Sequence, residues 1–255
     1  MKLSQEQVDR FAAEGFLVVK GMLDRTGIAA LAERAEWIAS GTASHIPAER
    51  LQREPSVKAG PATAPTFADS LRKMSRIAFA DEVFQEHARS QEILDVVEGL
   101  LGPDIKLYQD QLFMKPARVG SRQPYHQDQP LGFHVDPPDM VTCWAPMDRA
   151  SVENGCLWVL PGTHRSGVIP KEKWKEYEAQ SPAGQLTGEE RAIELEVGDC
   201  SFHHGLLLHS SRANSSPQRR RGYATHYVSS HCRHTGPSGK SDALLMRGRS
   251  IPGRV

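Results

Sequence analysis

The order of apolar and polar positions divides the chain into a helical first part and a strand-rich second part. Ser4 is followed three residues later by Gln7, a spacing typical of a helix N-terminus. A short apolar run over residues 16–20 predicts a strand. Helical spacing of apolar positions recurs in three stretches, which cover residues 5–14, 24–40 and 67–101.

Beyond Asp104 the apolar runs become short and are separated by turn residues such as Asn154-Gly155 and Pro161-Gly162. Many short strands with this punctuation predict a sandwich or barrel, here preceded by helices. We therefore expect a mainly β fold with flanking helices. The predicted strands cover residues 105–108, 111–115, 140–145, 157–160, 193–196, 200–203 and 223–229.

Two stretches show neither the apolar spacing of a helix nor the pattern of a strand. Residues 41–70 are rich in proline, and residues 171–190 form a polar insert that contains a tryptophan. Long loops of this kind are typical of functional lids. We expect one domain over residues 1–255, and its parts are a helical support over 1–102, a β core over 103–235 and a tail over 236–255.

Charge and composition exclude several classes of protein. The 255 residues contain 31 Lys+Arg and 31 Asp+Glu, so no overall basic field would attract nucleic acid or an anionic membrane. The longest apolar runs are too short to span a bilayer, and the first residues lack the apolar core of a signal peptide. The four cysteines form no C-x-x-C pair, and we expect a cytoplasmic protein with reduced thiols.

Chemistry is indicated by His126 and Asp128, read together with His209 and Arg220 downstream. Side chains two residues apart on a strand point to the same side. Two imidazoles and one carboxylate can hold one face of an iron(II) ion and leave the opposite face open. Arg220 lies eleven residues after His209 and would meet the far carboxylate of an organic acid bound to that iron.

The residues alone leave alternatives for each of these positions. His134 and Asp136 repeat the spacing, although the following Pro137-Pro138 favours a polar loop. His203-His204 competes for the second imidazole, and only one of two neighbours on a strand could face a metal. Arg219, Arg220 and Arg221 could equally form a solvated run of charges.

The chain resembles the phytanoyl-CoA dioxygenase family of iron(II)- and 2-oxoglutarate-dependent oxygenases, most closely its phytanoyl-CoA dioxygenase domain-containing branch. The resemblance runs from the N-terminal Glu14-Gly15-Phe16-Leu17 pattern, through Tyr125-His126-Gln127-Asp128, to Leu208-His209-Ser210-Ser211. Its most specific part is the run from Asn154-Gly155-Cys156-Leu157 to Pro161-Gly162-Thr163-His164. The fold that it implies is a double-stranded β-helix, the cupin-like jelly roll.

The resemblance also implies roles for individual residues. His126, Asp128 and His209 would hold Fe(II), while Arg220 and Ser211 would bind the distal carboxylate of 2-oxoglutarate. Because Asp128 is present, the resemblance disfavours the halogenating relatives, which replace this carboxylate. Three further positions would line the cosubstrate pocket, although each also fits an ordinary core or surface role: Lys73, Gln111 and Trp144.

The function that follows is a dioxygenase that uses O2 and 2-oxoglutarate to oxidise, and most simply hydroxylate, an unactivated C–H bond of a small metabolite or natural-product intermediate. Succinate and CO2 would be the coproducts. Three alternatives stay open: an acyl-CoA 2-hydroxylase, an inactive jelly-roll binding protein and a zinc hydrolase. The first would need a basic patch, for which Arg165, Lys171 and Lys173 are candidates. Neither the exact reaction nor the oligomeric state follows from the sequence.

Overall fold

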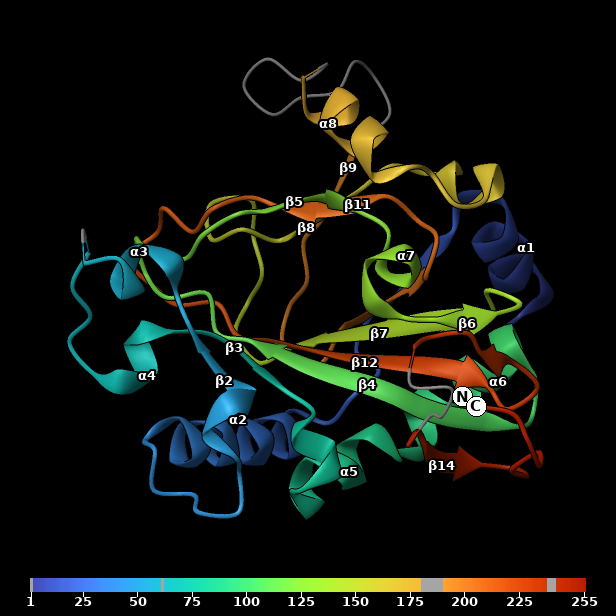
Figure 1. Ribbon diagram of the computed structural model, residues 1–255, viewed down its shortest axis with the longest axis horizontal. Coiled ribbons are helices and arrows are strands. Elements are labelled where there is room, and N and C mark those ends of the chain that lie inside the picture. The colour runs from blue at the N-terminus through green and yellow to red at the C-terminus, as the bar shows by residue number, and fades with distance from the viewer. Residues whose placement is uncertain (1, 61, 180–189, 238–241) are drawn as a thin grey trace.

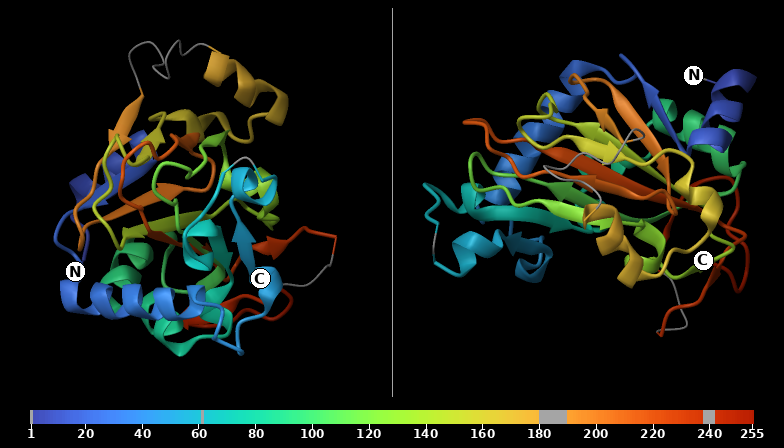
Figure 2. Two further views of the ribbon diagram at one scale, coloured as in Figure 1. Left: turned by 90° about the vertical axis from the view of Figure 1, so that its left-hand side faces the viewer. Right: turned by 90° about the horizontal axis from the view of Figure 1, so that it is seen from above.

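A computed structural model describes residues 2–60, 62–179, 190–237 and 242–255. Two antiparallel sheets face each other, and most of the helices lie against the outer face of the larger sheet (Figure 1). In the left view of Figure 2, the helix α2 (Arg25–Ala39) and the helix α8 (Lys171–Ala179) lie at opposite sides of this stack. This arrangement is the expected double-stranded β-helix, with sheets that stay open at their edges.

The helices begin where the sequence provides caps. The Ser4 hydroxyl accepts from the Gln7 amide and the Gln7 side chain bonds back to the Ser4 amide, which completes a capping box. Besides α2 and α8, the helices are α1 (Gln5–Glu14), α3 (Pro55–Lys58), α4 (Phe67–Ser70), α5 (Glu82–Ala88), α6 (Gln91–Leu101) and α7 (Asp128–Gly132), with 3-10 turns η1 (Ala48–Arg50), η2 (Ile77–Phe79) and η3 (Thr163–Ser166).

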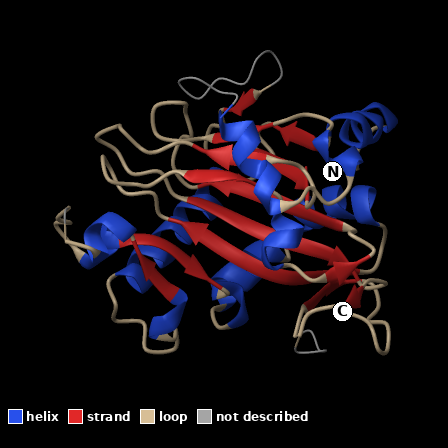
Figure 3. Ribbon diagram, turned by 45° about the horizontal axis from the view of Figure 1, so that its top comes forward, coloured by secondary structure: helices blue, strands red, loops and turns tan. Residues whose placement is uncertain are grey.

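The larger sheet has the strand order β1-β10-β7-β12-β4-β3-β2, and β14 also pairs with β4. Figure 3 shows its long central strands running across the molecule. Its strands are β1 (Phe16–Val19), β2 (Leu51–Arg53), β3 (Leu71–Ser75), β4 (Ile105–Phe113), β7 (Met140–Pro146), β10 (Cys200–His204), β12 (Gly222–Ser229) and β14 (Leu244–Arg247).

The smaller sheet has the order β5-β11-β8-β9, and a separate pair joins β13 to β6. The strands are β5 (Gln123–His126), β6 (Val135–Asp136), β8 (Leu157–Val159), β9 (Arg191–Ile193), β11 (His209–Ser211) and β13 (Arg233–His234). The apolar core is accordingly divided. One cluster fills the space between the helices and the larger sheet, and another, which includes Trp144, Val159 and Leu207, lies between the two sheets.

Several expected elements differ from those observed. The helix expected over residues 67–101 begins as α4 but is interrupted, because Leu71–Ser75 is a strand that pairs with both β2 and β4. Its buried positions, Leu71 and Met74, are three apart and imitate a helical period. The two strands expected within residues 105–115 are one strand, and the strand expected over 193–196 lies earlier, at Arg191–Ile193.

The structure describes nearly all of the irregular stretch 41–70 but only part of the stretch 171–190. Residues 41–70 contain β2, which pairs with β3 at an edge of the larger sheet, so part of this stretch belongs to the fold. The stretch 171–190 begins with α8, but residues 180–189 lie outside the described residues, and its role as a lid stays a prediction. In the described part of the chain, no helix has the length and apolar character needed to cross a bilayer.

Candidate metal and cosubstrate site

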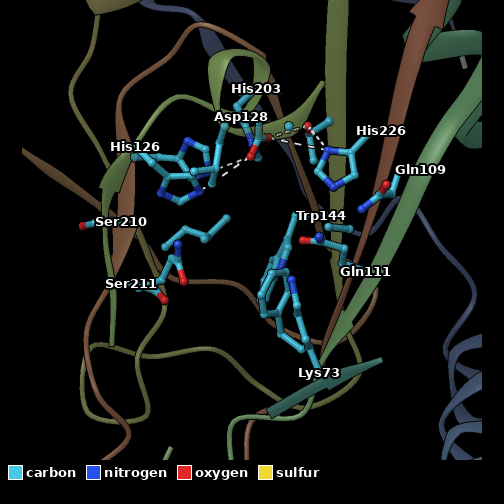
Figure 4. A pocket seen from close by; sticks show the side chains of 18 of the residues that line it. Lys73, Gln109, Gln111, His126, Asp128, Trp144, His203, Ser210, Ser211 and His226 are labelled. Atoms are coloured by element: carbon cyan, nitrogen blue, oxygen red, sulfur yellow. Dashed lines mark hydrogen bonds and ion pairs between the residues drawn. The ribbon is translucent and has the colours of Figure 1, made fainter. Parts of the chain in front are cut away.

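A cavity of about 440 Å³ opens between the two sheets and contains most of the predicted site residues. Figure 4 shows His126, Asp128 and His203 grouped at one end, Ser211 on one side, and Trp144 and Gln111 across from it. The cavity therefore brings together side chains from both sheets. Its lining includes Lys73, Gln111, His126, Asp128, Trp144, His209, Ser211 and Arg220.

The strongest feature of the cavity is the convergence of His126, Asp128 and His209. Their ligand atoms all lie within 4.8 Å of one another, and all three residues are buried. The Asp128 Oδ1 lies 3.6 Å from the Nε2 of His126 and 3.6 Å from the Nε2 of His209. Among the described residues, no other group of three His, Cys, Asp or Glu side chains is this compact.

Hydrogen bonds fix the ring nitrogen that each histidine presents. The His126 Nδ1 lies 2.8 Å from the Pro124 carbonyl, and the His209 Nδ1 lies 3.0 Å from the Leu207 carbonyl. A carbonyl only accepts, so each Nδ1 carries the hydrogen and each Nε2 presents a lone pair to the centre. This tautomer is the one that can bind a metal through Nε2.

The local fold explains how these residues meet. His126 and His209 are cross-strand partners on β5 and β11. The expectation that Asp128 also lies on the strand is wrong, because β5 ends at His126 and Asp128 is the first residue of α7. Gln127 between them keeps an extended backbone, with φ −105° and ψ 134°, so the two side chains still point the same way.

The second oxygen of Asp128 is held away from the centre. Its Oδ2 accepts a hydrogen bond of 3.0 Å from the Thr142 hydroxyl and lies 3.3 Å from the His203 Nε2. Burial alone would raise the pKa of Asp128, but the neighbouring imidazoles of His209, His126 and His203 outweigh it and hold this pKa well below its usual range. Asp128 is therefore an ionised carboxylate, and its Oδ2 is occupied by Thr142 and His203.

Thr142 and His203 belong to a polar row that crosses four strands of the larger sheet. Register places His203 on β10 opposite Thr142 on β7, Thr142 opposite His226 on β12, and His226 opposite Gln109 on β4. All four residues of this polar row line the cavity. The sequence did not predict the polar row, because only strand register reveals it. The available signal was a polar residue inside three of the expected strands, at Thr142, His203 and His226.

The predicted carboxylate-binding residues lie away from the metal end. Arg220 is 2% exposed, donates from Nη2 to the Gly155 carbonyl at 2.7 Å, and lies 5.2 Å from the centre of the Trp144 ring. Burial lowers the pKa of Arg220 to about 10, so it stays charged at neutral pH. Ser211 is buried on β11, two residues after His209, and lines the same cavity.

The neighbouring arginines point out of the cavity. Arg219 pairs with Glu36 and Asp69, while Arg221 pairs with Asp148 and Glu36. Alternation along the chain thus separates Arg220 from both neighbours. The ambiguity left by the sequence is resolved by geometry in favour of Arg220.

The remaining candidates also reach the cavity wall. Gln111 and Trp144 lie in one row of the larger sheet with the small residue Ala224 between them, which leaves space above the sheet. Lys73 comes from β3, and burial is the main cause that lowers its pKa. Their positions agree with a cosubstrate pocket, and their individual roles stay predictions.

The competing histidines have other surroundings. His134 and Asp136 belong to the β6–β13 region, where the Tyr108 hydroxyl lies 3.0 Å from the His234 Nδ1. His203 faces the cavity and contacts Asp128, whereas the His204 Nδ1 accepts from the Leu206 amide. His203 thus lies close to the proposed metal ligands, but its Nε2 contacts the Asp128 carboxylate rather than the metal position.

The donor set fits iron(II). Two neutral imidazole nitrogens and one carboxylate oxygen on one side of a buried centre form the arrangement typical of non-haem iron oxygenases. A closed tetrahedral zinc site would need a fourth protein ligand, and the described residues bring only three together here.

Comparisons with known proteins agree with this geometry. The model of the phytanoyl-CoA dioxygenase (PhyH) family matches residues 11–222. The peroxisomal phytanoyl-CoA dioxygenase of Mus musculus is 31% identical over 271 residues, covering 96% of this chain and 74% of that protein. The L-proline trans-4-hydroxylase of Streptomyces griseoviridis is 30% identical over 162 residues, covering 55% of this chain and 60% of that protein.

A solved structure supports the fold. The crystal structure of EctD from S. alaskensis with 2-oxoglutarate and 5-hydroxyectoine superposes with a TM-score of 0.76 at 21% identity, covering 98% of this chain and 85% of that chain. The family model, which spans most of the chain, carries the assignment. The chain belongs to the phytanoyl-CoA dioxygenase family and is an iron(II)- and 2-oxoglutarate-dependent oxygenase.

Proposed function

We propose that His126, Asp128 and His209 are the iron ligands of this oxygenase and that the substrate is a small polar metabolite. The observation that carries the metal assignment is the convergence of three buried ligand atoms within 4.8 Å in the cavity. When bound, iron(II) and 2-oxoglutarate supply the oxidising chemistry, with O2 as cosubstrate and succinate and CO2 as coproducts.

The protein's own part is to orient these groups and to exclude water. The polar row holds the Asp128 Oδ2, so that Oδ1 alone faces the centre. Arg220 and Ser211 would hold the distal carboxylate of 2-oxoglutarate, because a guanidinium directs a carboxylate as well as neutralising it. Gln111, Trp144 and Lys73 would form the walls around the cosubstrate.

The size and polarity of the cavity favour a small substrate. Its 440 Å³ must contain the cosubstrate as well as the reacting part of the substrate. The polar row adds a hydrogen-bonding group there: the His226 Nε2 is buried and has no partner among the described residues. One relative is named for hydroxylating L-proline, which is a substrate of this size and polarity.

The tautomer of His226 indicates what such a substrate would offer. The Thr142 hydroxyl gives its hydrogen to Asp128, so at 2.8 Å it accepts from the His226 Nδ1. In the neutral ring the Nε2 is then an acceptor. A substrate hydroxyl or amino group would donate to it and place the neighbouring C–H bond near the metal.

The main test measures O2 consumption and succinate release by protein that is loaded with iron(II) without oxygen and then given 2-oxoglutarate and air. We expect slow turnover in the unaltered protein and its loss in Asp128→Ala and Arg220→Ala. Arg219→Ala is a matched control, because Arg219 points outward into ion pairs and should keep full turnover. Absence of 2-oxoglutarate binding to the iron-loaded protein would contradict the assignment.

An acyl-CoA substrate is the second candidate, favoured by the 31% identical phytanoyl-CoA dioxygenase. The basic residues that it would need, Arg165, Lys171 and Lys173, are exposed on η3 and α8. Two panels separate the candidates: small amino and hydroxy acids, and saturated acyl-CoA thioesters. Extra succinate with the first panel alone supports the small polar substrate, and extra succinate with the second alone supports the acyl-CoA.

The cellular location is also a proposal. The four cysteines, which are Cys143, Cys156, Cys200 and Cys232, are all free and buried. Free thiols are typical of a reducing compartment, which supports a cytoplasmic location. Fractionation of cells that express the protein with a small tag would check it.

A further inference from the structure

One buried lysine of the cavity region has no role so far. Lys115 is 5% exposed and lies two residues after the end of β4. Its backbone is left-handed, with φ +30°. This conformation is unfavourable for a residue with a side chain, so surrounding contacts must hold it. The inference drawn from it rests on the proposed function, because it concerns the 2-oxoglutarate subsite.

Lys115 contacts both residues that are proposed to bind the distal carboxylate. Its carbonyl accepts from the Arg220 amide at 3.1 Å. Its Nζ donates to the Ser211 hydroxyl at 2.8 Å and also to the Arg212 carbonyl. A single residue therefore ties the backbone of Arg220 to the side chain of Ser211, across the gap between β11 and β12.

Gly155 makes this approach possible. A Cβ at this position would clash with the Arg212 carbonyl oxygen and lie 2.9 Å from the Lys115 Cε, and Gly155 has a left-handed backbone with φ +84°. The Gly155 carbonyl accepts from the Arg220 Nη2 at 2.7 Å. Both basic side chains thus meet over one glycine of the family's most specific motif, which explains why a side chain is excluded there.

The basic side chains around Gly155 could bind a further anion. The partners of the Lys115 amine are a hydroxyl and a carbonyl, and the Arg220 Nε has no partner among the described residues. Arg72, which lines the same region, donates to the neutral side chains of Ser121 and Gln123. Glu54 is the buried carboxylate of this region, and the direct hydrogen-bond partners of the three basic side chains are neutral oxygens, so an arriving carboxylate would stabilise them further.

We propose that Lys115 is a positioning residue of the 2-oxoglutarate subsite. Its backbone fixes Arg220 and its amine fixes Ser211, so both groups reach the distal carboxylate in one arrangement. When a bound carboxylate favours its protonation, the amine also adds a second positive charge behind Ser211. Lys115 thereby selects a dicarboxylate over a monocarboxylic 2-oxoacid.

The electrostatics of the free protein agree with this role. Burial, together with the nearby charges of Arg220 and Arg72, lowers the pKa of Lys115 to about 6. Glu54 and the buried Cys156 thiol are the other titratable groups that face it, and they act in the opposite direction. The amine is therefore largely neutral at pH 7.5, and an arriving carboxylate would raise its pKa, so binding should take up a proton.

The test compares Lys115→Met with the unaltered protein by calorimetry, after loading with Mn(II), which permits binding without turnover. The two probes are 2-oxoglutarate and 2-oxopentanoate, whose chain has the same length but ends in a methyl group. We expect Lys115→Met to weaken 2-oxoglutarate binding roughly 10- to 100-fold and to leave 2-oxopentanoate binding unchanged. Lys106→Met is a matched control, because Lys106 is a buried lysine of β4 outside the cavity lining.

A second readout needs no variant. Calorimetry of the unaltered protein at pH 7.5, in two buffers with different heats of ionisation, should show proton uptake when 2-oxoglutarate binds and none with 2-oxopentanoate. Equal affinities in Lys115→Met and the unaltered protein would overturn the inference, as would an equal loss for both probes or the absence of proton uptake. Failure of the unaltered protein to bind 2-oxoglutarate would instead contradict the proposed function.

Discussion

The hydroxyl of Thr142 is the residue-scale feature that most clearly serves the metal. It gives its hydrogen to the Asp128 Oδ2 at 3.0 Å and is 1% exposed. Thr142→Val keeps the shape of the side chain and removes this donor. Outer hydrogen bonds of this kind typically change metal affinity 10- to 100-fold, so we expect a loss of about that size when the protein is titrated with Mn(II).

The control for this substitution is Thr225→Val. Thr225 is equally buried on the neighbouring strand β12 and bonds weakly to the Cys143 carbonyl, outside the cavity lining. It should lose stability and keep its metal affinity. Equal metal affinities in both variants would show that Thr142 is a packing residue only.

Asp110 gives a residue-scale prediction about pH. Its carboxylate is fully buried and accepts from the Ile77 amide at 2.8 Å, but burial outweighs its hydrogen bonds and raises its pKa to about 6. The folded state therefore holds this proton more tightly than the unfolded state, whose Asp pKa is near 3.8. Stability is present in full below about pH 4 and falls as the pH rises through 6.

Asp110→Asn removes this titration. The free energy of unfolding of the unaltered protein, measured against the variant by urea denaturation, should fall by about 3 kcal/mol between pH 4 and pH 7. The comparison cancels the other titrating groups, which both proteins share. A difference that stays constant over this range would contradict a raised pKa at Asp110.

At the scale of elements, the strands β7 and β12 pack so closely that no additional atom fits between Gly222 and Trp144. Gly222 on β12 lies against the Trp144 ring, and a Cβ there would be 2.0 Å from Cζ2. Gly222→Ala must displace the indole or the strand, and overpacking of this kind typically costs 1–3 kcal/mol. We expect a loss of stability of about that size, together with weaker 2-oxoglutarate binding.

A second glycine serves as the matched control. A Cβ at Gly27 in α2 would meet nothing within 4 Å, and Gly27 is a helical residue. Gly27→Ala should raise stability by roughly 0.4–1 kcal/mol, since it lowers the entropy of the unfolded chain. Chemical denaturation of both variants would check that the free energy of unfolding falls in Gly222→Ala and rises in Gly27→Ala. A destabilisation of the same size in both would argue against the role of Trp144.

Elements also show where the sequence is informative. Short apolar runs and turn residues predict most of the β core, and the Ser4 cap predicts α1. The strand Leu71–Ser75 could not be recognised, because its buried residues follow a helical spacing and it is held by two neighbours that are distant in sequence. The start of α7 at Asp128 is equally hidden, since Gln127 stays extended.

For the whole molecule, ligand binding should be visible as stability. Saturation with Mn(II) and 2-oxoglutarate at roughly 100 times the dissociation constant contributes about 2.7 kcal/mol. For a chain of 255 residues this raises Tm by roughly 5–10 °C. Asp128→Ala should lose most of the increase; an increase of the same size in that variant would mean that the ion binds elsewhere.

The site as a whole was predictable only in part. The motif residues His126, Asp128, His209 and Arg220 stand out in the sequence, and the fold brings all four to one cavity. Their support does not stand out. The polar row exists only because four strands pair in a given register, and Lys115 matters only because the chain returns past it at Ser211 and Arg220.

The way Asp128 is held has a consequence for the order in which the protein matures. His126 and His209 come from the smaller sheet, whereas the partners of Asp128, Thr142 and His203, come from the larger one. The three ligands therefore assemble only after both sheets have formed and docked. We therefore expect iron to bind at the proposed site only after the two sheets have docked, so that a misfolded copy would be left without metal.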